Sequence, residues 1–168
     1  MDIIKEILDD IINYSLFFNK DEYIEKEHID KYIHYLYKNV NNNFCDSFFE
    51  KNFSIKNVDD VINIKDYIFR LTKGFQITNS IMIIAIIYLE RLDINLNIYN
   101  IHILLLISLL LSSKFLEDLY YKNKYWAKYG GINLAKFNRL EILYLIKIKN
   151  NLFIHSNEFY DKFNMIFQ

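Results

Sequence analysis

Four histidines and one cysteine are the side chains of this chain that could bind a metal or act as nucleophiles. His28 and His34 are six residues apart, which places them on different faces of a helix. The other two, His102 and His155, are far apart in the sequence, and Cys45 has no signature of a cysteine nucleophile around it. Neither HExxH nor a Cys/His ligand spacing occurs. The sequence therefore predicts no metal site and no catalytic residues.

Two further features resemble functional sites only superficially. His102 opens an apolar segment, where we interpret it as a first-turn residue that makes a local hydrogen bond. Gly130 and Gly131 are not followed by the Lys-Ser/Thr of a phosphate-binding loop, and no strand precedes them. We therefore expect no enzyme activity, no cofactor and no small-molecule substrate.

The length and net charge of the chain limit the remaining classes of function. The chain of 168 residues is one domain's worth of protein. Its net charge of -1 gives no basic excess for nucleic-acid binding, and a single cysteine cannot form an internal disulfide. The N-terminus alternates acids with isoleucines and does not resemble a signal peptide.

Two strongly apolar segments, 81–89 and 101–113, raise the question of a membrane span. Both are shorter than the about 20 apolar residues that a spanning helix needs. Charged connectors separate them, as in a helical bundle. We expect both to be buried helices of a soluble protein in the cytoplasm, the nucleus or both, with no membrane contact.

Apolar residues recur every three or four positions, and no alternating strand pattern is found, which predicts an all-α fold. The two most apolar helices should form its centre, and 120–131 should be a connector with one helical turn. Helices are expected at 3–12, 22–39, 64–73, 81–92, from Ile101 onward, at 134–148 and at 156–163. Helix caps are expected at Asn63, Thr78 or Asn79, Asn100 and Asn133, and a helix stop at Gly74.

Five segments in the second half of the chain resemble the motifs of one protein family. The segments are YLERL (88–92), IHILLL (101–106), SSKFLED (112–118), YYKNKYWAKYGGINLAKFNRLE (120–141) and NEFYDKF (157–163). In order and spacing they are similar to the cyclin box of the P-type, or U-type, cyclins, which include the phosphate-signalling cyclins. The resemblance implies one cyclin box of five helices over residues 57–168, with residues 1–56 as a helical N-terminal extension.

The resemblance also implies a function, that of a regulatory subunit which binds a cyclin-dependent kinase in cell-cycle or nutrient signalling. In cyclins the lysine of the ASKF-like motif and a glutamate of the next long helix face the kinase. These positions match Lys114 and Glu141. The pair would contact the kinase's αC helix and hold it in the active position, which phosphoryl transfer requires.

Motif position adds further candidates for the same surface. The resemblance implies that Leu111, Phe115, Leu145 and Leu152 line a groove for the αC helix, and that Asp118 faces a kinase arginine. Taken alone, the residues have simpler interpretations. Lys114 is favourable at a helix C-terminus through the helix dipole, Glu141 is an ordinary exposed acid, and the apolar residues belong to the core.

Some positions depart from the family pattern. Ile103 replaces an arginine, Glu117 replaces an aspartate, and Asn150 stands where many cyclins have an aromatic residue. The departures at Ile103 and Asn150 keep an alternative open, in which the chain is a cyclin-fold adaptor that binds a protein without activating a kinase.

Overall fold

The computed structural model describes residues 23–40, 47–56 and 61–168, and all regular structure in these ranges is helical. The expected helix at 3–12 and Cys45 lie outside the described residues. The helices are α2 (Lys26–Lys38), α3 (Phe48–Phe53), α4 (Ile64–Phe75), α5 (Asn79–Arg91), α6 (Ile101–Leu116), α7 (Asn123–Tyr129), α8 (Leu134–Lys147) and α9 (Ser156–Phe167). The all-α prediction is confirmed.

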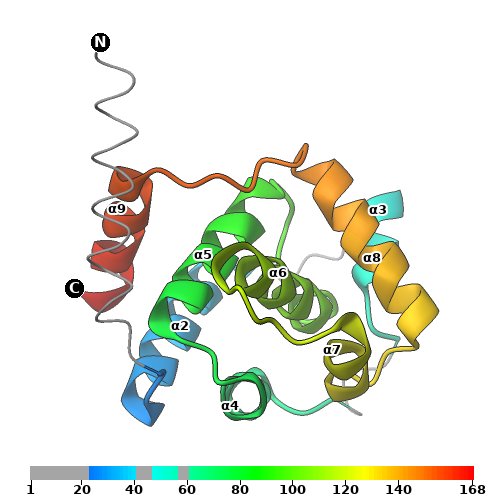
Figure 1. Cartoon of the computed structure of the whole chain (residues 1–168), viewed down its shortest axis with the longest axis horizontal. Helices are drawn as coiled ribbons and strands as arrows, with labels where there is room; N and C mark the ends of the chain where they lie inside the picture. Colours follow the sequence, from blue (N-terminus) through cyan, green and yellow to red (C-terminus); the bar gives the residue numbers. More distant parts are fainter. Residues whose placement is uncertain (1–22, 41–46, 57–60) are drawn as a thin grey trace.

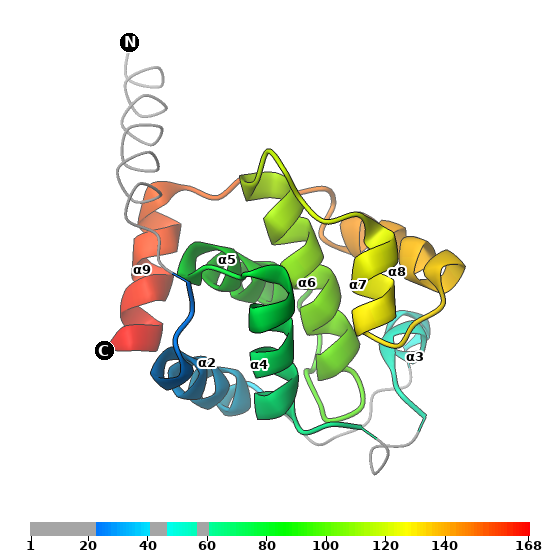
Figure 2. The ribbon, with the colours of Figure 1, turned by 60° about the horizontal axis from the view of Figure 1, so that its bottom comes forward.

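Helix α6 is the centre of the fold. Figure 1 views it almost end-on, with α5 beside it and with α4, α7 and α8 around it. The view in Figure 2 shows that α5 separates α6 from α2 and α9. All residues from Ile101 to Ser113 are buried, as are those from Ser80 to Leu89 in α5. An apolar surface on every side is what a helix surrounded by other helices needs, as the sequence predicted.

Three of the expected helix caps are present. The side-chain oxygens of Asn63, Thr78 and Asn133 accept hydrogen bonds from first-turn N–H groups of α4, α5 and α8. Asn100 precedes α6 but does not cap it, because its Oδ1 accepts from the N–H of Asn97 at 2.9 Å instead. The first helical residue of α9 is Ser156, as expected.

The expected stop at Gly74 is wrong. Helix α4 continues to Phe75 and ends at Gln76, which has a φ of 53°. The absence of a side chain at Gly74 instead lets the Tyr129 ring pack closely against α4, because a Cβ there would lie only 2.3 Å from Cε1 of Tyr129. A glycine is required by a neighbouring side chain here, and not by a turn.

Other helices also differ from the expectations, and α2 begins at Lys26, four residues later than expected. Helix α7 spans seven residues, where one turn was expected, and α9 runs to Phe167 and not to Phe163. Helix α3 was not predicted. It begins after Ser47, whose hydroxyl accepts from the N–H of Glu50 at 3.2 Å, and it buries Phe53 completely.

Helix α7 is held against α4 by aromatic packing. The Trp126 side chain is fully buried, and its ring stacks on Phe75 with centroids 3.7 Å apart and an angle of 6° between the planes. Gly130, directly after α7, leaves no room for a Cβ, which would lie 2.2 Å from Cδ2 of Leu106. These contacts fix the position of the segment that follows α6.

Helices α2 and α9 complete the core on the side of α5. Ile29, Tyr32 and Leu36 of α2 are buried, and the Tyr32 hydroxyl donates to Oδ1 of Asn79 at 2.7 Å. The segment 23–40 therefore shares one core with the helices that follow it. No helix within the described residues is long and apolar enough to cross a membrane, and α6 has only 16 residues.

Candidate functional site

Lys114 and Glu141 meet where α6 ends against the middle of α8. The Lys114 ammonium donates to Oε1 of Glu141 at 2.6 Å. Both side chains are largely buried, with 27% and 14% of their surfaces exposed. The pair joins residues that are 27 positions apart in the sequence.

The other carboxylate oxygen of Glu141 is also used. Asn123, the first residue of α7, donates from Nδ2 to Oε2 of Glu141 at 2.7 Å and to Oδ1 of Asn138 at 2.8 Å. On the other side the Lys114 ammonium lies 5.8 Å from the centre of the Tyr120 ring, within reach of a cation–π interaction. The pair is thus held by α6, α7, α8 and the α6–α7 connector. Sequence analysis did not identify Asn123, although it lies within the long motif 120–141.

The two acids after Lys114 differ in their surroundings. Glu117 turns back onto α6, where its carboxylate accepts a hydrogen bond from the Ser113 hydroxyl and its N–H donates to the Ser113 carbonyl at 2.9 Å. Burial raises the pKa of Glu117, and the Ser113 hydrogen bond partly opposes that rise. Asp118 is exposed and makes no ion pair with a described residue.

We expect the substitution Glu117→Gln to stabilise the fold slightly at neutral pH. Since burial disfavours the charged carboxylate, ionised Glu117 lowers stability above its raised pKa, and this loss disappears as the pH falls through that pKa. Glutamine keeps an acceptor for Ser113. Thermal unfolding should give a midpoint at pH 7 that is higher by no more than about 3 °C, because the site is partly solvated. The difference between the two midpoints should shrink toward pH 4. An equal difference at pH 4 and pH 7 would contradict the role of the Glu117 charge.

The four apolar candidates are exposed to different degrees. Leu111 is 3% exposed and belongs to the core, while Leu145 and Leu152 are half-buried and Phe115 is 41% exposed. Leu152 lies on the α8–α9 connector, where its carbonyl accepts from the Tyr88 hydroxyl at 2.8 Å. Phe115 is therefore the most exposed of the four, Leu145 and Leu152 are partly exposed, and Leu111 is hardly exposed at all.

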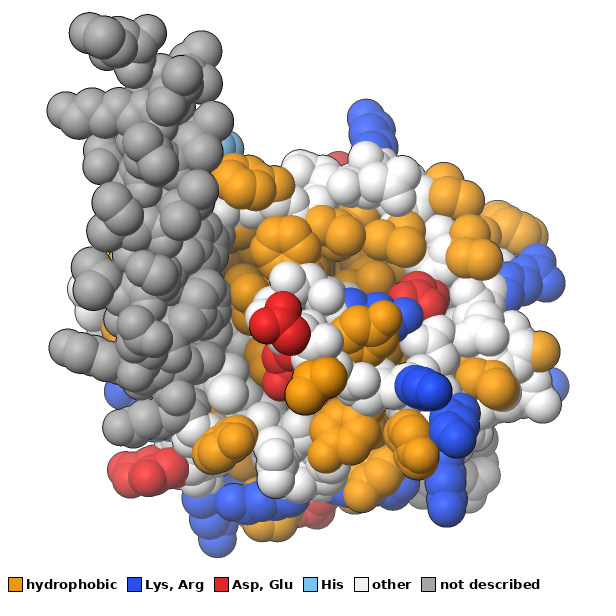
Figure 3. Space-filling view, in the orientation of Figure 1, with side chains coloured by type: hydrophobic (Ala, Val, Ile, Leu, Met, Phe, Trp, Pro, Cys, Tyr) orange, Lys and Arg blue, Asp and Glu red, His pale blue; other side chains and the backbone are white. Residues whose placement is uncertain are grey.

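Helix α8 has a second apolar face that sequence analysis did not single out. Phe137, Leu140, Tyr144 and Ile148 face the core, whereas Ile142 and Ile146 are 58% and 64% exposed next to Glu141 and Leu145. The signal was present, because these apolar residues are too many for one helical face. Figure 3 shows the side of the molecule where α6 ends, with hydrophobic side chains around a basic side chain that adjoins an acidic one.

The path of the connector after α8 depends on two left-handed residues and on hydrogen bonds from one arginine. Lys149 and Asn150 have φ values of 56° and 54°, a left-handed conformation that asparagine tolerates better than an aromatic residue does. Arg91 donates to the carbonyls of Asn151 and Phe153 at 2.7 and 2.9 Å and to the carboxylate of Glu158. Asn150 therefore has a local structural role at the end of α8.

Comparison with known proteins gives one family. The family model described as Cyclin matches residues 21–152. Cyclin-U4-1 of Arabidopsis thaliana is 36% identical over 103 residues, which are 58% of this chain and 51% of that protein. The PHO85 cyclin-like protein psl1 of Schizosaccharomyces pombe is 37% identical over 108 residues, 61% of this chain and 44% of that protein. PHO85 cyclin-7 of Saccharomyces cerevisiae is 29% identical over 129 residues, 67% of this chain and 45% of that protein. The chain thus spans about half the length of the curated relatives that it matches.

Proposed function

This chain belongs to the cyclin family, in its P-type or U-type branch, and from that premise we propose that it binds a cyclin-dependent kinase and activates it. The observation that supports the proposal most directly is the Lys114–Glu141 pair, preformed between α6 and α8 and surrounded by exposed apolar side chains. Cyclins are regulatory proteins, and we propose no catalysis by this chain.

The pair keeps hydrogen-bonding capacity for a partner. An ammonium has three N–H donors, and Lys114 uses one of them on Glu141. Each carboxylate oxygen of Glu141 accepts one hydrogen bond from a described residue, which leaves a lone pair. Lys114 can therefore donate to exposed carbonyls of a kinase segment while Glu141 accepts from its N–H groups.

The apolar part of the contact follows from the exposed side chains. We propose that Phe115, Leu145 and Leu152 contact the kinase's αC helix, and that Leu111 supports them from the core. Ile142 and Ile146 extend the same surface along α8. Asp118 is exposed beside it and would face a basic group of the kinase.

Activation in this proposal is a shift between two kinase conformations. A surface that fits the αC helix only in its inward position stabilises that conformation by the difference between the two binding free energies. The inward helix completes the kinase's own Lys–Glu ion pair, which phosphoryl transfer requires. We further propose that residues 57–168 form the cyclin box, that residues 1–56 are an N-terminal extension, and that the protein acts in the cytoplasm, the nucleus or both.

An assay of kinase activity separates this proposal from the adaptor alternative. The kinase that co-purifies with the tagged chain from its native cells is expressed alone, and its activity is measured with and without the chain. We expect stimulation of at least about tenfold, because the inactive kinase populates the inward position only as a minor state. Stoichiometric binding without stimulation would favour the adaptor, and failure to recover any kinase would contradict both the partner and the mechanism.

A further inference from the structure

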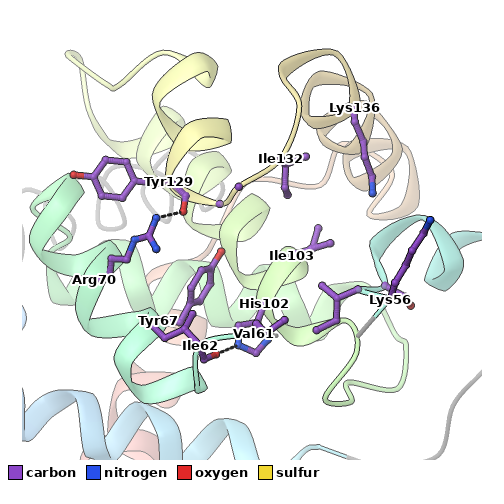
Figure 4. A pocket seen from close by; sticks show the side chains of 14 residues that line it. Lys56, Val61, Ile62, Tyr67, Arg70, His102, Ile103, Tyr129, Ile132 and Lys136 are labelled. Atoms are coloured by element: carbon purple, nitrogen blue, oxygen red, sulfur yellow. Dashed lines mark hydrogen bonds between the residues drawn. The ribbon is translucent and has the colours of Figure 1, made fainter. Parts of the chain in front are cut away.

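A basic cleft lies at the opposite end of α6 from Lys114. It has a volume of about 430 Å³ and is lined by α4, the first turns of α6 and α8, the turn between α7 and α8, and the described residues 54–56 and 61–62. Figure 4 shows it from close by. His102, in its floor, is twelve residues before Lys114, or roughly 18 Å along the helix. The cleft is therefore separate from the proposed kinase-binding surface.

Three cationic side chains surround the cleft. In Figure 4, Lys56 and Lys136 approach it from one side and Arg70 from the other. Among the described residues that line the cleft none is acidic, and neither lysine makes an ion pair with a described residue. Arg70 donates one N–H to the carbonyl of Tyr129 at 2.6 Å, which leaves further guanidinium donors. The charge of the cleft thus favours an anion.

A buried polar atom in the floor lacks a partner. His102 is only 9% exposed, and its Nε2–H donates to the carbonyl of Ile62 at 2.9 Å. Its Nδ1 is buried without a hydrogen-bond partner among the described residues. Beside it the Tyr67 hydroxyl points into the cleft (Figure 4). Because buried polar groups are almost always paired, this nitrogen needs a partner that the described residues do not supply, such as an ordered water or a ligand.

Two helices begin at the edge of the same cleft. Lining residues include His102 and Ile103 in the first turn of α6, Lys136 in the first turn of α8, and Ile132, which precedes the N-cap of α8. The dipole of a helix favours negative charge near its N-terminus, whereas the N–H groups of Ala135 and Lys136 in α8 already donate to Oδ1 of Asn133. These two helix starts add to the effect of the three cations and of His102.

We propose that this cleft binds the phosphate group of a phosphorylated serine or threonine in a protein partner. A phosphate monoester carries about 1.5 to 2 negative charges near neutral pH, which suits a cleft that three cationic side chains line. Lys56, Arg70 and Lys136 neutralise its charge, and Ile62, Ile103 and Ile132 provide apolar surface for the neighbouring residues. The proposal goes beyond kinase binding and does not depend on it, because the two sites occupy opposite ends of α6.

The test is an NMR titration of the full chain, without kinase, with N-acetyl-phosphoserine N-methylamide. We expect saturable shifts of the His102 imidazole and of the backbone amides of Gly131 and Ile132, and none with the unphosphorylated compound. The double variant Lys56→Gln/Lys136→Gln should bind at least about tenfold more weakly, since charge-assisted hydrogen bonds are lost. The matched variant Lys38→Gln/Lys124→Gln removes two exposed lysines outside the cleft and should bind normally.

Three results would overturn the proposal. The first is the absence of any shift at His102, and the second is an equal loss of affinity in both double variants. The third is tighter binding at the same residues by inorganic phosphate or by oligouridylate than by the phosphoserine compound, which would indicate an ion site or a nucleic-acid site. Phosphoserine binding tighter than that of inorganic phosphate supports a protein ligand. All these results are independent of whether a kinase binds at Lys114.

Discussion

The substitution Lys114→Glu is expected to abolish recovery of the kinase with the tagged chain. In the unchanged chain Glu141 accepts a hydrogen bond from the Lys114 ammonium at 2.6 Å. The substitution replaces that ammonium with a second carboxylate and inverts the charge presented to the kinase. Loss of one partner from a desolvated charge pair at an interface typically costs about 2–5 kcal/mol, so affinity should fall at least about thirtyfold. The measurement is the dissociation constant for the recovered kinase.

The charge-swapped variant Lys114→Glu/Glu141→Lys separates two roles of the pair. If the pair only links α6 to α8, the swap restores an ion pair and should restore binding. If the pair contacts the kinase, as we propose, the swap leaves both charges wrong for the partner and binding stays lost. Recovery of wild-type affinity in the swapped variant would therefore refute the interface.

A second ion pair provides the matched control for this swap. Lys65 of α4 pairs with Asp30 of α2, and both side chains are about half exposed, on helices away from the proposed surface. The swap Lys65→Glu/Asp30→Lys should leave kinase affinity unchanged. Thermal unfolding of each variant shows whether a loss of binding reflects a loss of fold.

The substitution Trp126→Ala is expected to have the largest effect on stability. The indole is fully buried, stacks on Phe75 at 3.7 Å, and closes the space between α4 and α7. Truncation of a buried aromatic residue to alanine costs about 3–5 kcal/mol, as lost transfer free energy plus the cavity that remains. Since domains are stable by only about 5–15 kcal/mol, much of the fold's stability depends on this side chain. Urea-induced unfolding measures the change.

Two neighbouring variants show whether burial is the cause. Tyr125 is 46% exposed on the same helix, and Tyr125→Ala should change the free energy of unfolding by less than about 1 kcal/mol. Trp126→Phe keeps a ring against Phe75 and removes an indole N–H that has no hydrogen-bond partner among the described residues. Trp126→Phe should therefore lower the free energy of unfolding by less than Trp126→Ala does. If Tyr125→Ala and Trp126→Ala lowered the free energy of unfolding equally, burial of the indole would not be the cause.

Much of the fold was predictable because its signals are local. The apolar surface around 101–113 requires a helix buried on all sides, and Asn63, Thr78 and Asn133 cap their helices through side-chain contacts within three residues. The order and spacing of the motifs from YLERL to NEFYDKF indicated the cyclin family, and the match over residues 21–152 confirms it.

The errors occurred where distant residues decide the local structure. Gly74 lies inside a helix, next to the Tyr129 ring, and no property of the sequence near Gly74 indicates that contact. The Asn100 side chain forms its hydrogen bonds with the preceding turn and not with the first-turn N–H groups of α6. Helix α7 is longer than its flanking sequence suggests, and its Trp126 stacks on a residue of α4.

The same division applies to the candidate sites. The sequence contains the functional groups, namely a lysine at the end of an apolar helix and a glutamate on the next long helix. Which side chains meet depends on the packing of the helices. The packing brings Lys114, Asn123 and Glu141 into one hydrogen-bonded group, and it places His102 and three cations from separate parts of the chain in the lining of one cleft. The physical reason is that side-chain type and helical period are local properties, whereas a site depends on how helices pack.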